Sequence, residues 1–166
     1  MDNVFDIKKD YASELVSELK KRGLKITFAE SCTGGLASAG IVDVPGASEI
    51  FYGSIVSYDN SIKEACLKVS SETLDKYSAV SHECAREMAE GVRKAIGSDI
   101  ALSMTGVAGP SGGTSENPVG TVYIGYSDGN ICESIKTFTE GDRRTIREIT
   151  CLKAYDYALR MIRREI

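Results

Sequence analysis

The sequence has no tryptophan, three prolines and a single histidine, His82. It also lacks any apolar run near the ~20 residues that a membrane span requires, which argues against a membrane partner. One histidine and no clustered cysteines exclude the usual zinc ligand sets, so we expect no metal and no other cofactor. Met1–Asp6 shows no charged segment followed by an apolar one, so we expect no signal peptide and a cytoplasmic protein.

The net charge bears on binding of nucleic acid, and the cysteine content bears on disulfides and on possible nucleophiles. The net charge is −4 and the isoelectric point is about 5.1, which argues against general binding of nucleic acid. Five cysteines without a CxxC pair favour free thiols over disulfides. Cys32 is the only one considered as a nucleophile, and without a histidine partner a bystander thiol is favoured.

The chain of 166 residues fits one domain, residues 1–166. Apolar periodicity and turn residues predict helices over 7–22, 36–42, 70–77, 81–96 and 141–166, and a short helix that carries Lys63. Strands are expected over 25–30, 51–58, 99–104, 119–127 and 131–139. Asp128-Gly129 predicts a hairpin between the last two strands, and Gly53 indicates a bulge or a close approach of another segment. Helices alternating with strands indicate an α/β fold, a three-layer α/β/α sandwich with a mixed sheet.

The stretch Ala29–Gly35 lies at a predicted strand-to-helix turn. A serine at such a turn, Ser31, lies beside free backbone N–H groups that can stabilise an oxyanion or hold a phosphate. Gly34 and Gly35 let the backbone approach a ligand closely. The alternative is that Ser31 or Thr33 merely caps the helix.

A second stretch, Thr105–Thr114, follows a predicted strand and is rich in glycine. Backbone N–H groups of such a loop can cradle a phosphate or carboxylate. It matches neither the Walker pattern nor the dinucleotide-binding fingerprint, and a purely structural loop remains the alternative. A base for Ser31 is not apparent from spacing: His82 is expected on the surface, and a lysine is the other known solution.

Six segments occur in order: Glu30–Gly35, Val44–Ser48, Tyr58–Asn60 with Lys63, Thr105–Gly113, Pro118–Val122 and Gly141–Arg143 with Ile146-Arg147. Together they resemble the C-terminal domain of the competence/damage-inducible CinA family, also met as a stand-alone nicotinamide-nucleotide amidase. The resemblance covers about Tyr11 to Leu159. Because the family's N-terminal nucleotide-pyrophosphatase domain is missing here, the stand-alone form is expected.

The resemblance implies hydrolysis of the carboxamide of nicotinamide mononucleotide, giving nicotinate mononucleotide and ammonia, by a homo-oligomer without a cofactor. The family's serine nucleophile falls on Ser31, and its lysine and assisting tyrosine fall on Lys63 and Tyr58. The alternative is a surface Lys63 and a core Tyr58. Expected substrate-binding residues are Glu30, Thr33, Gly34, Gly35, Asn60, Thr105, Gly106, Gly109, Ser111, Gly112, Gly113, Arg143 and Arg147.

Arg143, Arg147 and the Thr105–Gly113 loop are expected to hold the phosphate and ribose. A guanidinium fork suits a dianion, a helix start favours it, and loop amides can supply the remaining donors. A solvated arginine-rich face is the alternative. Two further functions stay open: a non-catalytic nucleotide-binding or interaction module, and hydrolysis of another small amide. An intact Ser31, Tyr58 and Lys63 favours the enzyme, because a pocket that only binds needs no nucleophile and base.

Overall fold

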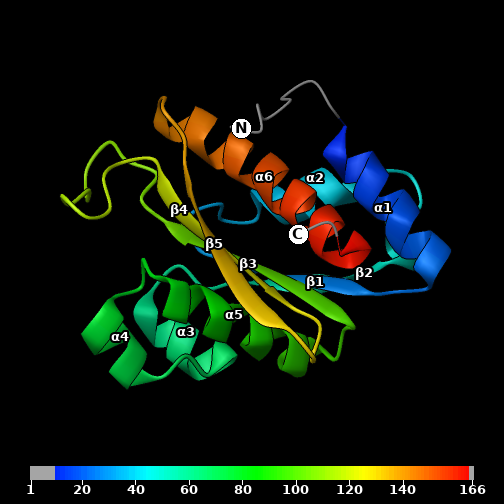
Figure 1. Ribbon diagram of the computed structural model, residues 1–166, viewed down its shortest axis with the longest axis horizontal. Coiled ribbons are helices and arrows are strands. Elements are labelled where there is room, and N and C mark those ends of the chain that lie inside the picture. Colours follow the sequence, from blue (N-terminus) through cyan, green and yellow to red (C-terminus); the bar gives the residue numbers. More distant parts are fainter. Residues whose placement is uncertain (1–9, 165–166) are drawn as a thin grey trace.

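The structure is a computed structural model that describes residues 10–164. A five-stranded sheet with the order β2-β1-β3-β4-β5 lies between two layers of helices (Figure 1). The first three strands, β1 (Ile26–Glu30), β2 (Phe51–Val56) and β3 (Ile100–Gly106), are parallel. β4 (Thr121–Ser127) runs antiparallel to β3, and β5 (Cys132–Phe138) antiparallel to β4. The predicted three-layer α/β/α sandwich with a mixed sheet is therefore confirmed.

The helices divide equally between the two faces of the sheet. α1 (Tyr11–Arg22), α2 (Leu36–Val42) and α6 (Arg143–Arg163) cover one face, and α3 (Asn60–Leu67), α4 (Ser71–Tyr77) and α5 (His82–Ile96) the other (Figure 1). A one-turn 3₁₀ helix, Ala47–Glu49, precedes β2. Within residues 10–164, no helix combines the length and the apolar character that a membrane span needs.

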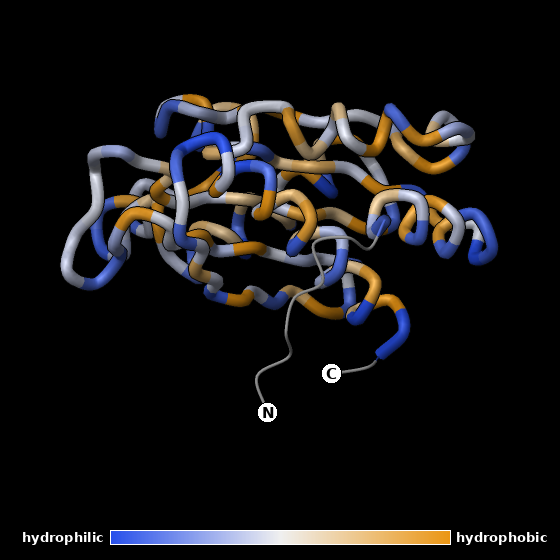
Figure 2. The backbone as a smooth tube through the Cα atoms, turned by 90° about the horizontal axis from the view of Figure 1, so that it is seen from above, coloured by the Kyte–Doolittle hydropathy of each residue, from blue (hydrophilic) through white to orange (hydrophobic). Residues whose placement is uncertain are grey.

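Burial explains why these segments pack as layers. Two clusters of buried apolar side chains form, one around Phe28, Leu102 and Leu15, the other around Met88 and Val92 of α5. Hydrophobic segments run along the central strands, while hydrophilic residues gather at helix ends and loops (Figure 2). Because apolar side chains on both faces of the sheet leave water, both helical layers are held by the hydrophobic effect.

Local sequence signals account for the helix ends. The side chains of Asp59, Ser70 and Ser81 each accept a hydrogen bond from the first turn of the helix they precede. Gly23, in the left-handed region, ends α1. The parts of the two terminal helices predicted over 7–9 and 165–166, and the Met1–Asp6 segment, lie outside the described residues.

The predicted strand bounds differ from the structure by two residues at three ends, one of which is the end of β3 at Gly106, and by one residue at four others. β2 ends at Val56, so that Tyr58 lies in the connection to α3, and β4 begins at Thr121, after Gly120 at φ +100°. The predicted bulge is confirmed, because Ile26 pairs with Phe51 and Thr27 with Gly53, which leaves Tyr52 without a partner on β1.

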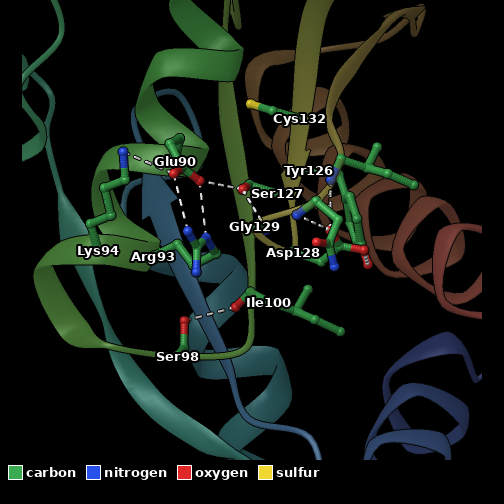
Figure 3. A network of polar contacts seen from close by, with 12 residues as sticks. Glu90, Arg93, Lys94, Ser98, Ile100, Tyr126, Ser127, Asp128, Gly129 and Cys132 are labelled. Atoms are coloured by element: carbon green, nitrogen blue, oxygen red, sulfur yellow. Dashed lines mark hydrogen bonds and ion pairs between the residues drawn. The ribbon is translucent and has the colours of Figure 1, made fainter.

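A polar network fastens α5 to the hairpin between β4 and β5 (Figure 3). Glu90 accepts hydrogen bonds from Arg93 at 2.9 and 3.1 Å and from the Ser127 hydroxyl. The Arg93 guanidinium lowers the pKa of Glu90 to about 2, so the carboxylate stays ionised near neutral pH. Since Ser127 pairs with Ala101 at the start of β3, this network holds the end of the sheet away from the carboxyl ends of the parallel strands.

Candidate active site

Three segments meet at the carboxyl ends of the parallel strands: the Ser31 turn after β1, the connection with Ser57 after β2 and the glycine-rich loop after β3. Ser31 follows β1 and its N–H donates to the Met104 carbonyl of β3 at 2.9 Å, while the Ser57 N–H donates to the Glu30 carbonyl at 2.8 Å. Residues of these three segments line a cavity of about 290 Å³. Its lining residues are Ser31, Cys32, Tyr58, Asn60, Lys63, Ala79, Val80, Thr105, Gly106, Val107, Ala108, Gly109, Ser111, Gly112 and Arg143.

Ser31 and Lys63 are brought together inside this cavity. The Lys63 ammonium nitrogen, Nζ, lies 3.2 Å from the Ser31 hydroxyl oxygen, although the residues are 32 positions apart. Lys63 sits on the sheet-facing side of α3 and only 1% of its surface is exposed. Burial disfavours the charged form and lowers the pKa of Lys63. The alternative of a surface lysine is therefore wrong.

Two main-chain carbonyls complete the surroundings of the lysine nitrogen. Nζ donates to the carbonyl oxygen of Ser57 at 2.8 Å and to that of Tyr58 at 3.1 Å. A neutral amine has two N–H groups and one lone pair. As an ammonium, Lys63 donates its third N–H to the Ser31 hydroxyl oxygen. Once neutral, with its two N–H groups on the carbonyls, it has its lone pair left for the Ser31 proton, which is the geometry of a general base beside a hydroxyl.

Tyr58 lies at the rim of the cavity and is 62% exposed, so the alternative of a core tyrosine is also wrong. Its hydroxyl is 3.0 Å from a terminal nitrogen of Arg143, and the other terminal nitrogen of Arg143 donates to the Gly109 carbonyl at 2.7 Å. Within the described chain the Tyr58 hydroxyl makes no hydrogen bond to Lys63 or Ser31. Tyr58 contacts the lysine through its main chain, which differs from the expected assistance by the phenol.

Glu30 does not line the cavity, which corrects its assignment to substrate binding. Its side chain is fully buried and accepts hydrogen bonds from the N–H groups of Gly35, Ala37 and Ser38 at 2.8–3.1 Å. The carboxylate thus occupies the start of α2, where unsatisfied donors attract an anion. The same contacts show that neither Ser31 nor Thr33 caps this helix, so that alternative is wrong.

The backbone donors left for an oxyanion are fewer than the sequence indicates. Gly34 N–H donates to the Ser31 carbonyl at 3.2 Å and Gly35 N–H to Glu30. Within residues 10–164 no other residue accepts a hydrogen bond from the N–H of Cys32 or of Thr33. Thr33 is fully buried and does not line the cavity, so the Cys32 N–H, directly after Ser31, is the donor available to hold negative charge.

Arg147, expected at the phosphate, points to the other side of the Ser31 turn. Its Nε donates to the Cys32 carbonyl at 3.1 Å and a terminal nitrogen donates to the Thr33 carbonyl at 2.6 Å. Thr33, Gly34 and Gly35 also lie outside the cavity lining, because the turn presents only Ser31 and Cys32 to it. Gly113 of the glycine-rich loop lies outside the lining as well. A phosphate role for Arg147 is not supported by this placement.

The first half of the glycine-rich loop, residues 105–109, is packed against its neighbours. A β-carbon on Gly106 would lie 2.4 Å from the Thr121 carbonyl oxygen, and one on Gly109 would lie 2.4 Å from a methyl carbon of Val119. The Thr105 hydroxyl donates to the Ala79 carbonyl at 2.6 Å, and this hydrogen bond joins two segments that line the cavity. Close approach to β4 therefore requires glycine here.

Sequence reasoning missed the apolar wall formed by Ala79, Val80, Val107 and Ala108, and the lining role of Cys32. Small apolar residues carry no chemical signal in a sequence. Burial raises the pKa of the Cys32 thiol to about 12, which favours the bystander interpretation. His82 Nδ1 lies 2.8 Å from the Ser134 hydroxyl and the residue does not line the cavity.

A larger hollow of about 570 Å³ lies along α5, between Cys66 and Cys132. It pairs no nucleophile with a base, so the smaller cavity is the candidate site. Across the described part of the chain, no group of three histidine, cysteine or acidic side chains is placed to hold a metal ion.

A family model described as the CinA C-terminal domain matches residues 8–165. The chain belongs to the CinA C-terminal domain family. A CinA-like protein of Dictyoglomus thermophilum is 53% identical over 148 residues, which are 88% of this chain and 36% of the relative. A putative competence-damage inducible protein of Thermoanaerobacter pseudethanolicus is 44% identical over 162 residues, which are 97% of this chain and 39% of the relative.

Among solved structures, a competence-damaged protein (CinA) superfamily protein of Klebsiella pneumoniae superposes with a TM-score of 0.90 at 29% identity. The match covers 93% of this chain and 97% of that one. The chain spans well under half the length of the two curated relatives above, so it is similar to one part of those proteins. The CinA domain described here thus has the family fold, and its activity is a separate question.

Proposed function

We propose that this CinA domain is an amidase that hydrolyses the carboxamide of nicotinamide mononucleotide to nicotinate mononucleotide and ammonia. The observation that carries the proposal is the buried Lys63 amine, 3.2 Å from the Ser31 hydroxyl and held by two carbonyls. The substrate class comes from the resemblance to nicotinamide-nucleotide amidases of the family. A buried amine beside a serine has the arrangement that activates a hydroxyl for acyl transfer.

The reaction runs in two halves. Neutral Lys63 takes the Ser31 proton as the oxygen attacks the carboxamide carbon, and the N–H of Cys32, a residue of the cavity lining, holds the oxyanion. Lys63 then gives the proton to the leaving nitrogen, ammonia departs, and an ester on Ser31 remains. Water attacks that ester, loses its proton to Lys63, and releases nicotinate mononucleotide while Ser31 regains its proton.

The direct test is ammonia release from nicotinamide mononucleotide by the purified protein. We expect stoichiometric ammonia and nicotinate mononucleotide, without added cofactor. Free nicotinamide and an unrelated small primary amide serve as comparison substrates. Ammonia from the unrelated amide alone would favour the second hydrolase function, and no ammonia from any of them would favour the non-catalytic binding module.

Replacing Arg143 by alanine is expected to weaken recognition of the phosphate. Arg143 lies at the first position of α6, faces the cavity and contacts the Gly109 carbonyl of the loop. Loss of a charge-assisted phosphate contact costs about 2 kcal/mol, or about thirtyfold in kcat/KM. The measurement compares nicotinamide mononucleotide with the phosphate-free riboside.

The matched control is Arg144→Ala. Arg144 is 85% exposed, pairs with Glu148 at 2.7 Å and lies outside the cavity lining. Its loss should therefore leave kcat/KM unchanged for both substrates. If Arg143→Ala slows hydrolysis of the riboside as much as that of the mononucleotide, Arg143 does not bind the phosphate.

The homo-oligomer expected from the family resemblance stays a prediction.

A further inference from the structure

We infer that Asn117 is a positioning residue that fastens the Ala79–Val80 part of the cavity wall to the β4–β5 hairpin. The inference rests on the proposed function only for its kinetic effect. It starts from the side-chain amide of Asn117. The amide nitrogen, Nδ2, donates to the Val80 carbonyl at 3.1 Å, and the amide oxygen, Oδ1, accepts from the Tyr123 hydroxyl at 3.0 Å. Val80 lines the cavity and Tyr123 belongs to β4, so one side chain joins the wall to the sheet.

The chemistry of its neighbours fixes the orientation of this side-chain amide. A main-chain carbonyl only accepts hydrogen bonds, so the NH₂ group faces Val80 and the amide oxygen is left for the Tyr123 hydroxyl. The Tyr123 side chain is buried, and its ring packs edge-on against the ring of His82 with centroids 4.7 Å apart. Because the ring is held by packing, its hydroxyl is a fixed donor. Asn117 is therefore anchored on the sheet side before it reaches Val80.

The main chain of Asn117 is anchored as well. Its N–H donates to the Thr114 hydroxyl at 3.0 Å and its carbonyl accepts from the Thr114 N–H at 3.0 Å, which closes a turn at the end of the glycine-rich loop. The adjacent Glu116 carbonyl accepts from the ammonium group of Lys136, on β5, at 2.9 Å. The turn and the hairpin together set the position from which the side-chain amide reaches the cavity wall.

The Ala79–Val80 segment has few other hydrogen bonds that could fix it. Within residues 10–164, two side chains from outside residues 78–81 donate to it, Thr105 to the Ala79 carbonyl and Asn117 to the Val80 carbonyl. The other hydrogen bonds of Val80 are with Ser78, two positions away, and move with the segment. Loss of the Asn117 amide would leave the Val80 carbonyl without a partner from another segment, so this part of the wall would be free to shift.

This contact concerns substrate binding rather than proton transfer. Asn117 makes no hydrogen bond to Ser31 or Lys63 within the described chain, so the nucleophile and its base keep their geometry without it. A displaced wall weakens contacts with the substrate in the ground state and the transition state alike, which raises KM and leaves kcat unchanged. Since Val80 is apolar, it suits the pyridine ring and not the phosphate. The mononucleotide and the riboside should therefore be affected equally, in contrast to the effect expected for Arg143→Ala.

The test is Asn117→Ala, assayed with nicotinamide mononucleotide and its riboside. One hydrogen bond is worth about three- to tenfold in affinity, so we expect KM to rise by that factor on both substrates, with kcat changed by less than about twofold. Asn130→Ala is the matched control and should keep wild-type KM, because Asn130 is exposed, lies outside the cavity and bonds to Asp128 through its main-chain N–H. An unchanged KM in Asn117→Ala would overturn the inference, and so would a fall in kcat at constant KM.

Two further variants test the contacts of the side-chain amide one at a time. Asn117→Asp keeps an acceptor for the Tyr123 hydroxyl but turns a second acceptor toward the Val80 carbonyl, so KM should rise at least as much as in Asn117→Ala. Tyr123→Phe keeps the buried ring and removes only the hydroxyl, which guards against a variant that does not fold. We expect a smaller rise in KM, since Asn117 loses its fixed donor. Wild-type KM in either variant would overturn the inference.

The double variant tests whether Tyr123 acts through Asn117. If it does, Tyr123→Phe has nothing further to disturb once the side-chain amide is gone. Asn117→Ala combined with Tyr123→Phe should then have the KM of Asn117→Ala alone. Two factors that multiply in the double variant would show independent effects and would overturn the inference.

A second readout does not depend on the substrate. Hydrogen–deuterium exchange of the backbone N–H groups over residues 78–81 reports opening of this part of the wall. We expect faster exchange there in Asn117→Ala than in the wild type or Asn130→Ala, with unchanged exchange in the second half of α5. A wild type that releases no ammonia while the variant shows this faster exchange would refute the proposed function alone. Equal exchange in Asn117→Ala and the wild type would refute the role of Asn117.

Discussion

Replacing Ser31 by alanine is expected to reduce ammonia release from nicotinamide mononucleotide by at least about a thousandfold. The hydroxyl is the only nucleophile of the cavity with a base beside it, since the Lys63 nitrogen lies 3.2 Å away. The neighbouring Cys32 cannot substitute for it, because burial raises the pKa of that thiol to about 12. Removal of the attacking atom therefore eliminates the covalent path rather than slowing it.

The fold and substrate binding should survive this change. Alanine fits where serine was, and the turn keeps its hydrogen bonds from the Ser31 N–H and to the Ser31 carbonyl. Calorimetry should give a dissociation constant for the mononucleotide close to the wild-type value. Ser48→Ala replaces an exposed serine outside the cavity and is the matched control, which should keep wild-type activity and affinity. Ammonia release near the wild-type rate by Ser31→Ala would refute the covalent mechanism.

Replacing Lys63 by methionine is expected to reduce kcat by at least about a hundredfold. Methionine keeps an unbranched side chain of similar length but offers no lone pair to the Ser31 proton. Lys68→Met, at the exposed end of the same helix, is the matched control and should keep wild-type activity. Retention of activity in Lys63→Met would show that another group is the base.

The pH dependence of the wild type checks the same role. Burial lowers the pKa of Lys63, and the mechanism requires the neutral amine. Below that pKa the neutral fraction grows about tenfold per pH unit, so kcat/KM should rise with pH and level off. The midpoint should lie below the usual lysine value. A profile that is flat through this range, or that falls as pH rises, would contradict Lys63 as the base.

Much of this fold is readable from local sequence signals. Asp59, Ser70 and Ser81 start their helices, Gly23 ends one, and Asp128-Gly129 closes the hairpin, because capping and turn chemistry act between near neighbours. The order of helices and strands then indicates an α/β sandwich with a mixed sheet. The place of Ser31 between a strand and a helix made it a candidate in the same way, and its assignment as the nucleophile came from the family resemblance.

Contacts between distant segments were beyond such signals. Lys63 looks like any other lysine in the sequence, and only its burial beneath the Ser31 turn gives it a lowered pKa and a serine partner. Glu30 and Arg147 were both expected at the substrate, but one holds the start of α2 and the other the carbonyls behind the turn. Polar side chains satisfy buried backbone groups wherever folding places them, and that placement is decided by packing across the whole sheet. The sequence by itself therefore determined the elements and the fold class and singled out Ser31 as a candidate, whereas tertiary structure decided which charged residues face the cavity.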